Sequence, residues 1–341
     1  MQEIMLSGGR PTGKLHMGHY VGAFKTFADM QKDYDNYFII SDIHMLTTKA
    51  TKKEIDTIFN NSLNMIIDAI GMGIDPSITT FYLQSQIPYL SHIFGIFQNY
   101  VKLDRVNNTP SLIEMSKHAN QDEVSLGLVA YPVLEAADVF ALKADIVPVG
   151  KDNIDHIKIT QEIIKYLNAE FNAHFKIPNY VTTDNNHIPG LDGSNKMSKS
   201  LDNAIYIRDT REDVIRKITS MNWVEANSGK DNIVMKYIDI FSPQIFEKVN
   251  QKYLEGKLSE RAAKEILIEV LDSILEPMRE RMRPYVENKD LAFDLLYSGT
   301  KKVKEIADQS MFELREAIGL VDLEKQRKEL VLRKVKWAKY Y

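Results

Sequence analysis

The sequence of 341 residues contains no cysteine. Disulfide bonds, cysteine-ligated zinc and thiol nucleophiles are therefore excluded, so a metal ion would need oxygen or imidazole ligands, and we expect no zinc. No apolar run approaches the roughly 18 to 20 residues that cross a bilayer, and the N-terminus lacks a basic segment followed by an apolar one. We therefore expect a cytoplasmic protein that makes no membrane contact.

The sequence also has no large excess of charge of either sign, because it contains 43 Lys and Arg residues and 47 Asp and Glu residues. A net charge of −4 gives no global attraction for nucleic acid, so an RNA partner would have to meet local basic patches. The hydrophobic share of 44% and the charged share of 26% are ordinary for a globular protein. A chain of this length can bury a large core and favours two or three domains.

The first half of the chain alternates short apolar segments with amphipathic ones. This pattern is typical of parallel strands connected by helices and predicts an α/β fold. The predicted strands span residues 3–7, 36–41, 79–84 and 145–149. A capping-box pattern at Thr51 and Glu54 opens a predicted helix that ends near Gly71.

From about residue 208 long helical periods replace this alternation. They begin at a second capping-box pattern from Thr210 to Asp213 and continue over residues 259–275 and 300–318, where Gly319 fits a helix C-cap. We therefore predict a domain of residues 1–207 and a helical domain of residues 208–320. The helical part starts with four basic residues, Arg208, Arg211, Arg216 and Lys217. They could bind RNA phosphates or simply form a solvent-exposed helix face.

The C-terminal tail, residues 321–341, holds seven Lys and Arg against three Asp and Glu. Such a basic segment can contact RNA phosphates. Trp337, Tyr340 and Tyr341 could stack on bases or pack on their own domain.

A first motif follows the first predicted strand, where residues 10–19 read Arg-Pro-Thr-Gly-Lys-Leu-His-Met-Gly-His. In an open parallel sheet, ligands bind where strand ends meet helix N-termini, which favour phosphate. Gly18 lets a nucleotide approach the backbone, and His16 and His19 can donate hydrogen bonds to phosphate oxygens. Two histidines at this spacing could instead lie on the surface or bind a metal.

A second motif lies far downstream, where residues 196–200 read Lys-Met-Ser-Lys-Ser after the glycine-rich residues 190–194. Two lysines on a loop that glycines make flexible suit a leaving pyrophosphate. Taken alone, the same five residues are also typical of a solvated loop.

The two motifs, complete and in this order, resemble the signatures of class I aminoacyl-tRNA synthetases. The resemblance implies a Rossmann-like parallel-sheet catalytic domain, with a helical insertion and a dimer interface, followed by an all-helical anticodon-binding domain. It implies that His16, Gly18 and His19 contact ATP. It also implies that Lys196 and Lys199 stabilise the triphosphate as pyrophosphate leaves, and that Mg2+ accompanies ATP.

Residues 131–138 are predicted to form a helix on which Glu135 and Asp138 share a face, and two acids there can line one pocket. Indole N–H is only a donor, so a buried carboxylate satisfies it, whereas a phenol also seeks a donor. Acids at this spacing could equally meet water or lysines, so spacing alone does not identify a substrate.

The resemblance is more specific here. Residues 136–138, Ala-Ala-Asp, and residues 146–150, Ile-Val-Pro-Val-Gly, are similar to the tryptophanyl-tRNA synthetases, whereas tyrosyl enzymes carry an aromatic residue before the Asp and a Gly-Gly-Ser-Asp-Gln segment. The similarity extends over residues 1–320.

Carried over position by position, the resemblance implies three groups of site residues. The catalytic ones are His16, His19, Lys196 and Lys199. Those that bind ATP are Arg10, Pro11, Thr12, Gly18, His19, Lys117, Gly150, Lys151, Asp152, Ile188, Lys196, Met197, Ser198, Lys199 and Ser200. Those that bind tryptophan are Leu6, His44, Glu135, Asp138, Val147 and Val149.

Two positions depart from the family pattern: Glu135 stands where glutamine or methionine is usual, and residues 152–153, Asp-Asn, replace the commoner Asp-Gln. If Glu135 is ionised it could pair with the substrate ammonium. If Asp138 repels it, Glu135 would instead be held protonated.

The function that the resemblance implies is activation of L-tryptophan with ATP and its transfer to tRNA(Trp) by a homodimer. Three alternatives remain: a tyrosine-tRNA ligase, a small-molecule nucleotidyltransferase that uses the same histidine motif, and a non-catalytic paralogue that binds tryptophan or RNA.

Overall fold

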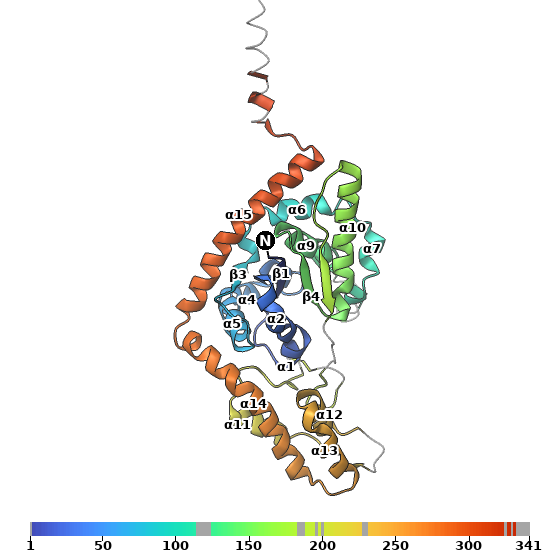
Figure 1. Ribbon diagram of the computed structural model, residues 1–341, viewed down its shortest axis with the longest axis vertical. Helices are drawn as coiled ribbons and strands as arrows, with labels where there is room; N and C mark the ends of the chain where they lie inside the picture. Colours follow the sequence, from blue (N-terminus) through green and yellow to red (C-terminus); the bar gives the residue numbers. More distant parts are fainter. Residues whose placement is uncertain are drawn as a thin grey trace, which may run out of the picture.

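A five-stranded parallel sheet forms the centre of the protein, with helices on both faces (Figure 1). The computed structural model describes residues 2–113, 124–182, 188–194, 197–198, 201–226, 231–323, 326–328 and 330–331. The strands are β1 (Ile4–Gly9), β2 (Asp35–Ile40), β3 (Thr79–Leu83), β4 (Ile146–Val149) and β5 (Asn179–Thr182). Their order in space is β3-β2-β1-β4-β5, so the direction of winding changes between β1 and β4.

All four predicted strands are confirmed, with boundaries that agree within two residues. The fifth, β5, was not predicted, because Asn179–Thr182 is short and half-exposed at the edge of the sheet. Its pairing with β4 makes it a strand, as Val147 lies opposite Tyr180. An edge strand with one neighbour lacks the continuous apolar run that marks the buried strands.

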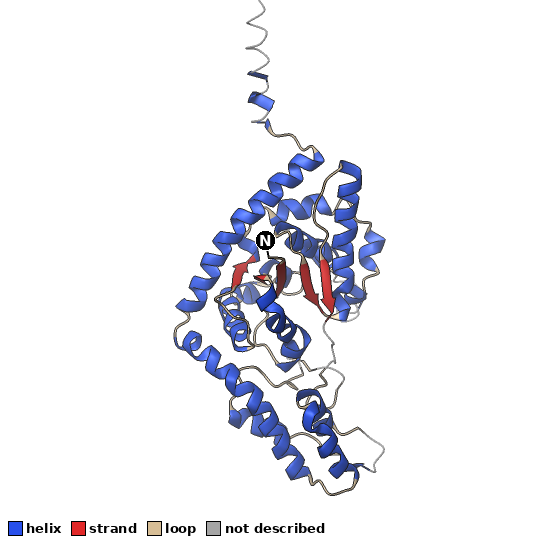
Figure 2. Ribbon diagram, viewed as in Figure 1, coloured by secondary structure: helices blue, strands red, loops and turns tan. Residues whose placement is uncertain are grey.

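Helices dominate the rest of the chain (Figure 2). In the first half they are α1 (Met17–His19), η1 (Tyr20–Phe24), α2 (Lys25–Met30), η2 (Gln31–Asp33), α3 (Asp42–Leu46), α4 (Lys52–Ile55), α5 (Ile58–Gly71), η3 (Gln84–Gln86), α6 (Leu90–Phe97), α7 (Leu103–Asn107), α9 (Leu126–Ala141), η5 (Lys151–Asn153) and α10 (Ile154–Phe171). In the second half they are α11 (Arg211–Thr219), α12 (Ile233–Phe241), α13 (Pro243–Leu254), α14 (Glu260–Glu287) and α15 (Asp290–Ile318). No helix in the part of the chain that the structure describes is long and apolar enough to cross a membrane.

The two helix starts predicted from capping boxes are confirmed, whereas the predicted start at residue 300 was wrong, because α15 begins ten residues earlier at Asp290. Thr51 and Glu54 form a reciprocal capping box at α4, and Thr210 and Asp213 form one at α11. Gly319 ends α15 with a positive φ of 72°, as expected for a glycine C-cap. The prediction of one continuous helix over residues 51–71 was wrong in detail, because a turn at residues 56–57 interrupts the helix between α4 and α5.

The sheet separates two hydrophobic cores. Phe38 and Ile40 of β2 point into the core that α5 and α14 cover, whereas Tyr37 and Ile39 point into the core under α9 and α10. This alternation follows from the two-residue period of a strand. Because both faces of a parallel sheet are buried, the strands read as nearly continuous apolar runs.

The last long helix, α15, returns to the sheet and lies beside the edge strand β3 (Figure 1). Gly299 permits this approach, since an added Cβ would lie 2.1 Å from the carbonyl oxygen of Phe81. A hydrogen bond also joins α15 to β3, because the Leu83 N–H donates to Thr300 Oγ1 at 3.1 Å. The predicted domain boundary near residue 208 stays a prediction.

Replacing Gly299 with alanine is expected to destabilise the protein by about 1 to 3 kcal/mol, because the new methyl group meets strand backbone that cannot move aside. The matched control is Gly95→Ala in α6, where an added Cβ meets nothing within 4 Å. That control should be neutral or more stable by roughly 0.5 to 1 kcal/mol, since alanine favours a helix. Urea denaturation compares the two, and equal stabilities would contradict the close packing of α15 on β3.

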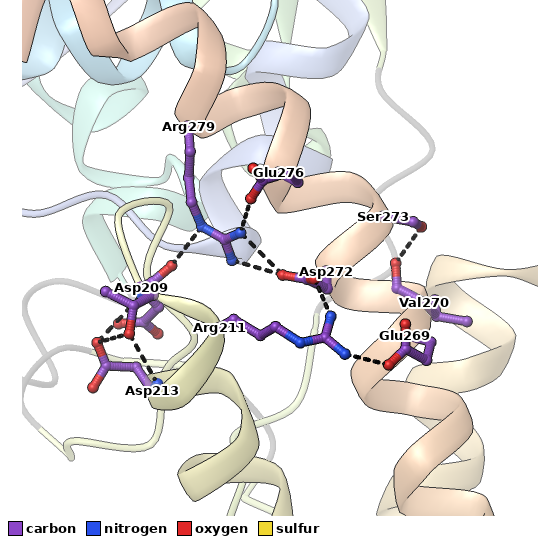
Figure 3. A network of polar contacts seen from close by, with 10 residues as sticks. Asp209, Arg211, Asp213, Glu269, Val270, Asp272, Ser273, Glu276 and Arg279 are labelled. Atoms are coloured by element: carbon purple, nitrogen blue, oxygen red, sulfur yellow. Dashed lines mark hydrogen bonds and ion pairs between the residues drawn. The ribbon is translucent and has the colours of Figure 1, made fainter.

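The basic group at the start of the helical part pairs with acids inside the protein. Arg211 bridges Glu269 and Asp272 of α14, and Arg279 donates to Asp272 at 2.9 Å and to the Asp209 carbonyl at 3.0 Å (Figure 3). The remaining pairs are Arg208–Asp68, Arg216–Asp213 and Lys217–Asp209. The Arg211 and Arg279 contacts hold the start of α11 against α14, and Arg208 ties the preceding residues to α5, whereas the last two pairs are local to α11 and the residues before it.

Candidate active site

The histidine motif begins α1, which follows β1 after a seven-residue loop. His16 is the N-cap of α1: its Nδ1 accepts the Gly18 N–H at 3.2 Å, while His19 Nδ1 accepts the His16 N–H at 3.1 Å. A ring nitrogen that accepts carries no proton, so each neutral ring holds its proton on Nε2. Both imidazoles are therefore set as Nε2 donors, the form that binds phosphate oxygens.

The segment that follows the second motif, residues 201–207, lies against the histidine motif. The Met17 N–H donates to the Ile205 carbonyl at 2.9 Å, and the Ile207 N–H donates to the Leu15 carbonyl at 3.1 Å. Gly18 faces the second motif itself, because a Cβ added to it would lie 4.0 Å from Met197. Residues about 190 positions apart in the sequence thus meet at one edge of the sheet.

Other predicted ATP-binding residues surround this contact. Met197 and Ile188 are buried and joined by a backbone hydrogen bond of 2.9 Å. The Ser198 N–H donates to Asn203 Oδ1 at 2.7 Å. Lys117, Lys196, Lys199 and Ser200 lie outside the described residues.

The predicted residues 10–12 and 150–152 follow two adjacent strands. Arg10, Pro11 and Thr12 leave the end of β1, whereas Gly150 and Lys151 leave the end of β4 and lead into α10. The point between β1 and β4 is where the strand order reverses, and in open α/β sheets the crevice at that point binds ligands. The structure therefore brings these two segments to the place where open α/β sheets bind ligands; Asp152 follows in η5.

Asp138 is buried on α9 and accepts three hydrogen bonds. Gln84 Nε2 donates to both of its oxygens, at 3.0 and 2.8 Å, and His44 Nε2 lies 3.0 Å from Oδ2. Burial raises the pKa of Asp138, although the hydrogen bonds from His44 and Gln84 oppose that rise. The carboxylate is consequently held in one orientation by donors from two neighbouring strand ends.

Sequence analysis did not identify Gln84. Its Oε1 accepts the N–H groups of Ile43 and His44 at 3.1 and 3.2 Å, so one side chain joins the start of α3 to Asp138. Its position at the end of β3 was a signal that could have found it, because polar residues there face the ligand edge of a parallel sheet.

The predicted apolar residues lie in the same core as α9. Leu6, Val147 and Val149 are buried with Ala137 beneath that helix. Met5 of β1 pairs with Ile146 of β4, so Leu6 and Val147 are neighbours on adjacent strands. The sheet thus places an apolar surface next to a buried carboxylate.

Glu135 lies one turn before Asp138 on α9 but has a different partner. Its Oε2 lies 2.8 Å from His156 Nδ1. Burial acts to raise the pKa of Glu135, but the charge and hydrogen bond of His156 outweigh burial and lower it. Glu135 is therefore ionised, and the repulsion that would hold it protonated does not dominate.

The chain matches the family described as tRNA synthetases class I (W and Y) over residues 2–282. It is 38% identical to the tryptophan-tRNA ligase of Borreliella burgdorferi and 35% identical to that of Treponema pallidum, covering 94% and 96% of those proteins and 94% and 93% of this chain. The structure of tryptophanyl-tRNA synthetase from Campylobacter jejuni complexed with ADP and tryptophan superposes with a TM-score of 0.79 at 27% identity, covering 93% of this chain and 100% of that one. The chain therefore belongs to the class I tRNA synthetases of the tryptophan and tyrosine family, and within it to the tryptophanyl-tRNA synthetases.

Proposed function

We propose that this protein activates L-tryptophan with ATP, forming tryptophanyl-adenylate and pyrophosphate, and then transfers tryptophan to tRNA(Trp). The observation that carries the proposal is the contact between the histidine motif and the segment that directly follows the Lys-Met-Ser-Lys-Ser motif. The Met17 N–H and the Ile205 carbonyl make that contact at 2.9 Å. The same edge of the sheet thus offers donors for a triphosphate and an acceptor for an indole.

In the activation step, a carboxylate oxygen of tryptophan attacks the α-phosphorus of ATP. The bond between that phosphorus and the oxygen that bridges the α- and β-phosphates then breaks. Negative charge moves onto the phosphate oxygens as pyrophosphate leaves. His16 and His19 would donate from Nε2 to these oxygens, and Lys196 and Lys199 would follow the leaving group. Catalysis is then by positioning and electrostatic stabilisation.

Asp138 would accept the indole N–H of tryptophan. A carboxylate has about four lone-pair sites, so the three hydrogen bonds from Gln84 and His44 leave room for one more. Leu6, Val147 and Val149 would cover the ring, because they are buried on the strands beneath α9. Tyrosine fits this site less well, because its hydroxyl oxygen would still need a donor after its O–H had donated to Asp138.

Mg2+ would arrive with ATP and act by neutralising phosphate charge. Among the described residues, no three His, Asp or Glu side chains gather into a possible metal site. Mg2+ commonly keeps several waters and takes substrate phosphates as ligands, so ATP itself can supply its oxygens. The proposal further includes a homodimer, recognition of tRNA(Trp) by the helical part and the basic tail, and action in the cytoplasm.

The decisive experiment is ATP–pyrophosphate exchange with each of the twenty amino acids, followed by aminoacylation of tRNA(Trp). Exchange with tryptophan alone and charging of that tRNA support the proposal. Preference for tyrosine would replace it with the related ligase, and exchange that never leads to charging would point to another nucleotidyltransferase.

Alanine at Lys196 or Lys199 is expected to slow adenylate formation by about 10²- to 10³-fold with little change in tryptophan affinity, because the proposed contact strengthens only as pyrophosphate separates. Single-turnover rates and equilibrium binding of tryptophan measure the two quantities. The matched control is Lys248→Ala on the exposed face of α13, which should change neither. An equal loss in tryptophan binding would assign these lysines a structural role.

A further inference from the structure

The glycine-rich segment just before the Lys-Met-Ser-Lys-Ser motif forms a closed turn. The Gly190 N–H donates to the Ser194 carbonyl at 2.9 Å, and the Gly193 N–H donates to the Gly190 carbonyl at 2.9 Å. Ser194 also donates to Asp192 Oδ1, from its Oγ at 2.7 Å and from its N–H at 3.1 Å. Residues 190–194 therefore have one defined shape beside the motif.

Asn203 joins this turn to the motif from the other side. Its Nδ2 donates to Asp192 Oδ1 at 3.0 Å and to Ser194 Oγ at 2.8 Å, whereas its Oδ1 accepts the Ser198 N–H at 2.7 Å. The Leu191 N–H also donates to the Asn203 carbonyl at 2.9 Å. Asn203 is only 3% exposed. One buried side chain thus holds a residue of the motif beside the turn.

The partners on both sides fix the orientation of the Asn203 amide. A backbone N–H only donates, so the Ser198 N–H requires the amide oxygen. The hydrogen bonds from Ser194 and Asn203 lower the pKa of Asp192, so this carboxylate is ionised at neutral pH. An ionised carboxylate only accepts, so it requires the amide NH2 group. Rotating the amide by half a turn would therefore face acceptor with acceptor and donor with donor.

Ser198 lies between the two lysines of the motif, two positions after Lys196 and one before Lys199. The neighbouring Met197 is fixed as well, because its N–H donates to the Ile188 carbonyl at 2.9 Å and its side chain is buried. Consecutive Cα atoms are about 3.8 Å apart, so an anchor at Ser198 limits where both lysines start. Rates depend steeply on such placement, since an error of about 1 Å can cost about 10²-fold.

We propose that Asn203 is a positioning residue for adenylate formation: it anchors the Lys-Met-Ser-Lys-Ser motif to the turn of residues 190–194 and thereby positions the two lysines of the motif for the leaving pyrophosphate. This inference rests on the proposed function, because it uses the pyrophosphate contact of these lysines. Gly190 belongs to the same arrangement, since a Cβ added there would collide with Asn203 Nδ2. The anchor contributes to the rate of the chemical step and not to the binding of tryptophan.

The test replaces Asn203 with alanine and compares it with Asn232→Ala. Asn232 is a matched control, because it is also buried and also bridges two segments: its Oδ1 accepts the Val234 N–H at 3.0 Å, and its Nδ2 donates to the Val224 carbonyl at 2.6 Å. Both variants should lower the thermal denaturation midpoint, since each loses buried hydrogen bonds. Only Asn203→Ala should slow single-turnover adenylate formation, by about ten- to hundredfold, with the Kd for tryptophan unchanged. A normal rate in Asn203→Ala, or an equal loss in Asn232→Ala, would overturn the inference.

Two further measurements separate positioning from a general loss of structure. In a double-mutant cycle, the Asn203→Ala effect should largely vanish when Lys196 and Lys199 are both alanine, because its route to the pyrophosphate is then gone. Asp192→Ala removes an exposed partner of the amide and leaves the core intact. It should slow the same step by a smaller factor, since Ser194 Oγ still accepts from Nδ2. Additive effects in the cycle, or a normal rate in Asp192→Ala, would contradict the anchor. Failure of wild-type protein to exchange with tryptophan would instead remove the proposed function.

Discussion

Replacing His16 with asparagine is expected to slow tryptophanyl-adenylate formation by about 10²- to 10³-fold, the usual loss for one donor to a developing oxyanion. The helix start should survive, because asparagine is a strong N-cap whose oxygen can accept the Gly18 N–H in place of His16 Nδ1. What disappears is the Nε2–H donor. Single-turnover quench-flow at saturating ATP and tryptophan measures the rate, and thermal denaturation measures the fold.

Two other substitutions at histidines serve as controls for His16→Asn. His16→Ala removes the cap together with the donor, so it should lose about 1 kcal/mol of stability in addition to the rate. His174→Asn, at an exposed position outside the site, should alter neither quantity. A normal rate for His16→Asn would mean that the ring serves α1 only as a cap.

Asparagine at Asp138 is expected to raise the KM for tryptophan by about ten- to hundredfold, equivalent to roughly 1 to 3 kcal/mol of charge-assisted hydrogen bonding. The amide brings two donors to a position that already receives donors from Gln84 and His44. His44 can adjust its tautomer, but Gln84 must then share one remaining oxygen with the indole. The fold should persist, since the shape of the side chain is conserved.

The matched control is Asp145→Asn, a second buried acid that lies before β4 and away from the site. Asp145 accepts the Ile4 N–H at 2.8 Å and pairs with Lys176. Its amide variant should lower the denaturation midpoint while leaving the KM for tryptophan unchanged. Tryptophan kinetics that stay normal in Asp138→Asn would exclude Asp138 as the indole acceptor.

Local patterns were sufficient for the elements whose causes are local. The strand β2 is recognisable because its residues are apolar on both faces. The starts of α4 and α11 are recognisable because each capping box spans four consecutive residues. Helix α14 exceeded its predicted end at residue 275 by twelve residues and contains Pro277 and Pro284. Met278 and Met282 are buried on that helix, and their packing offsets the hydrogen bonds that the prolines remove.

The amino-acid sequence by itself determined the α/β class, four of the five strands, the two signature motifs and the family that they indicate. Only the tertiary structure decided which partners the site residues have. Glu135 and Asp138 lie three residues apart, yet Glu135 contacts His156, 21 positions later, and Asp138 contacts His44, 94 positions earlier. Sequence spacing sets only the helix face on which a side chain starts. The packing of α3, α9 and α10 around the strand ends determines which distant donor meets each carboxylate, and with it the direction in which the pKa of each acid shifts.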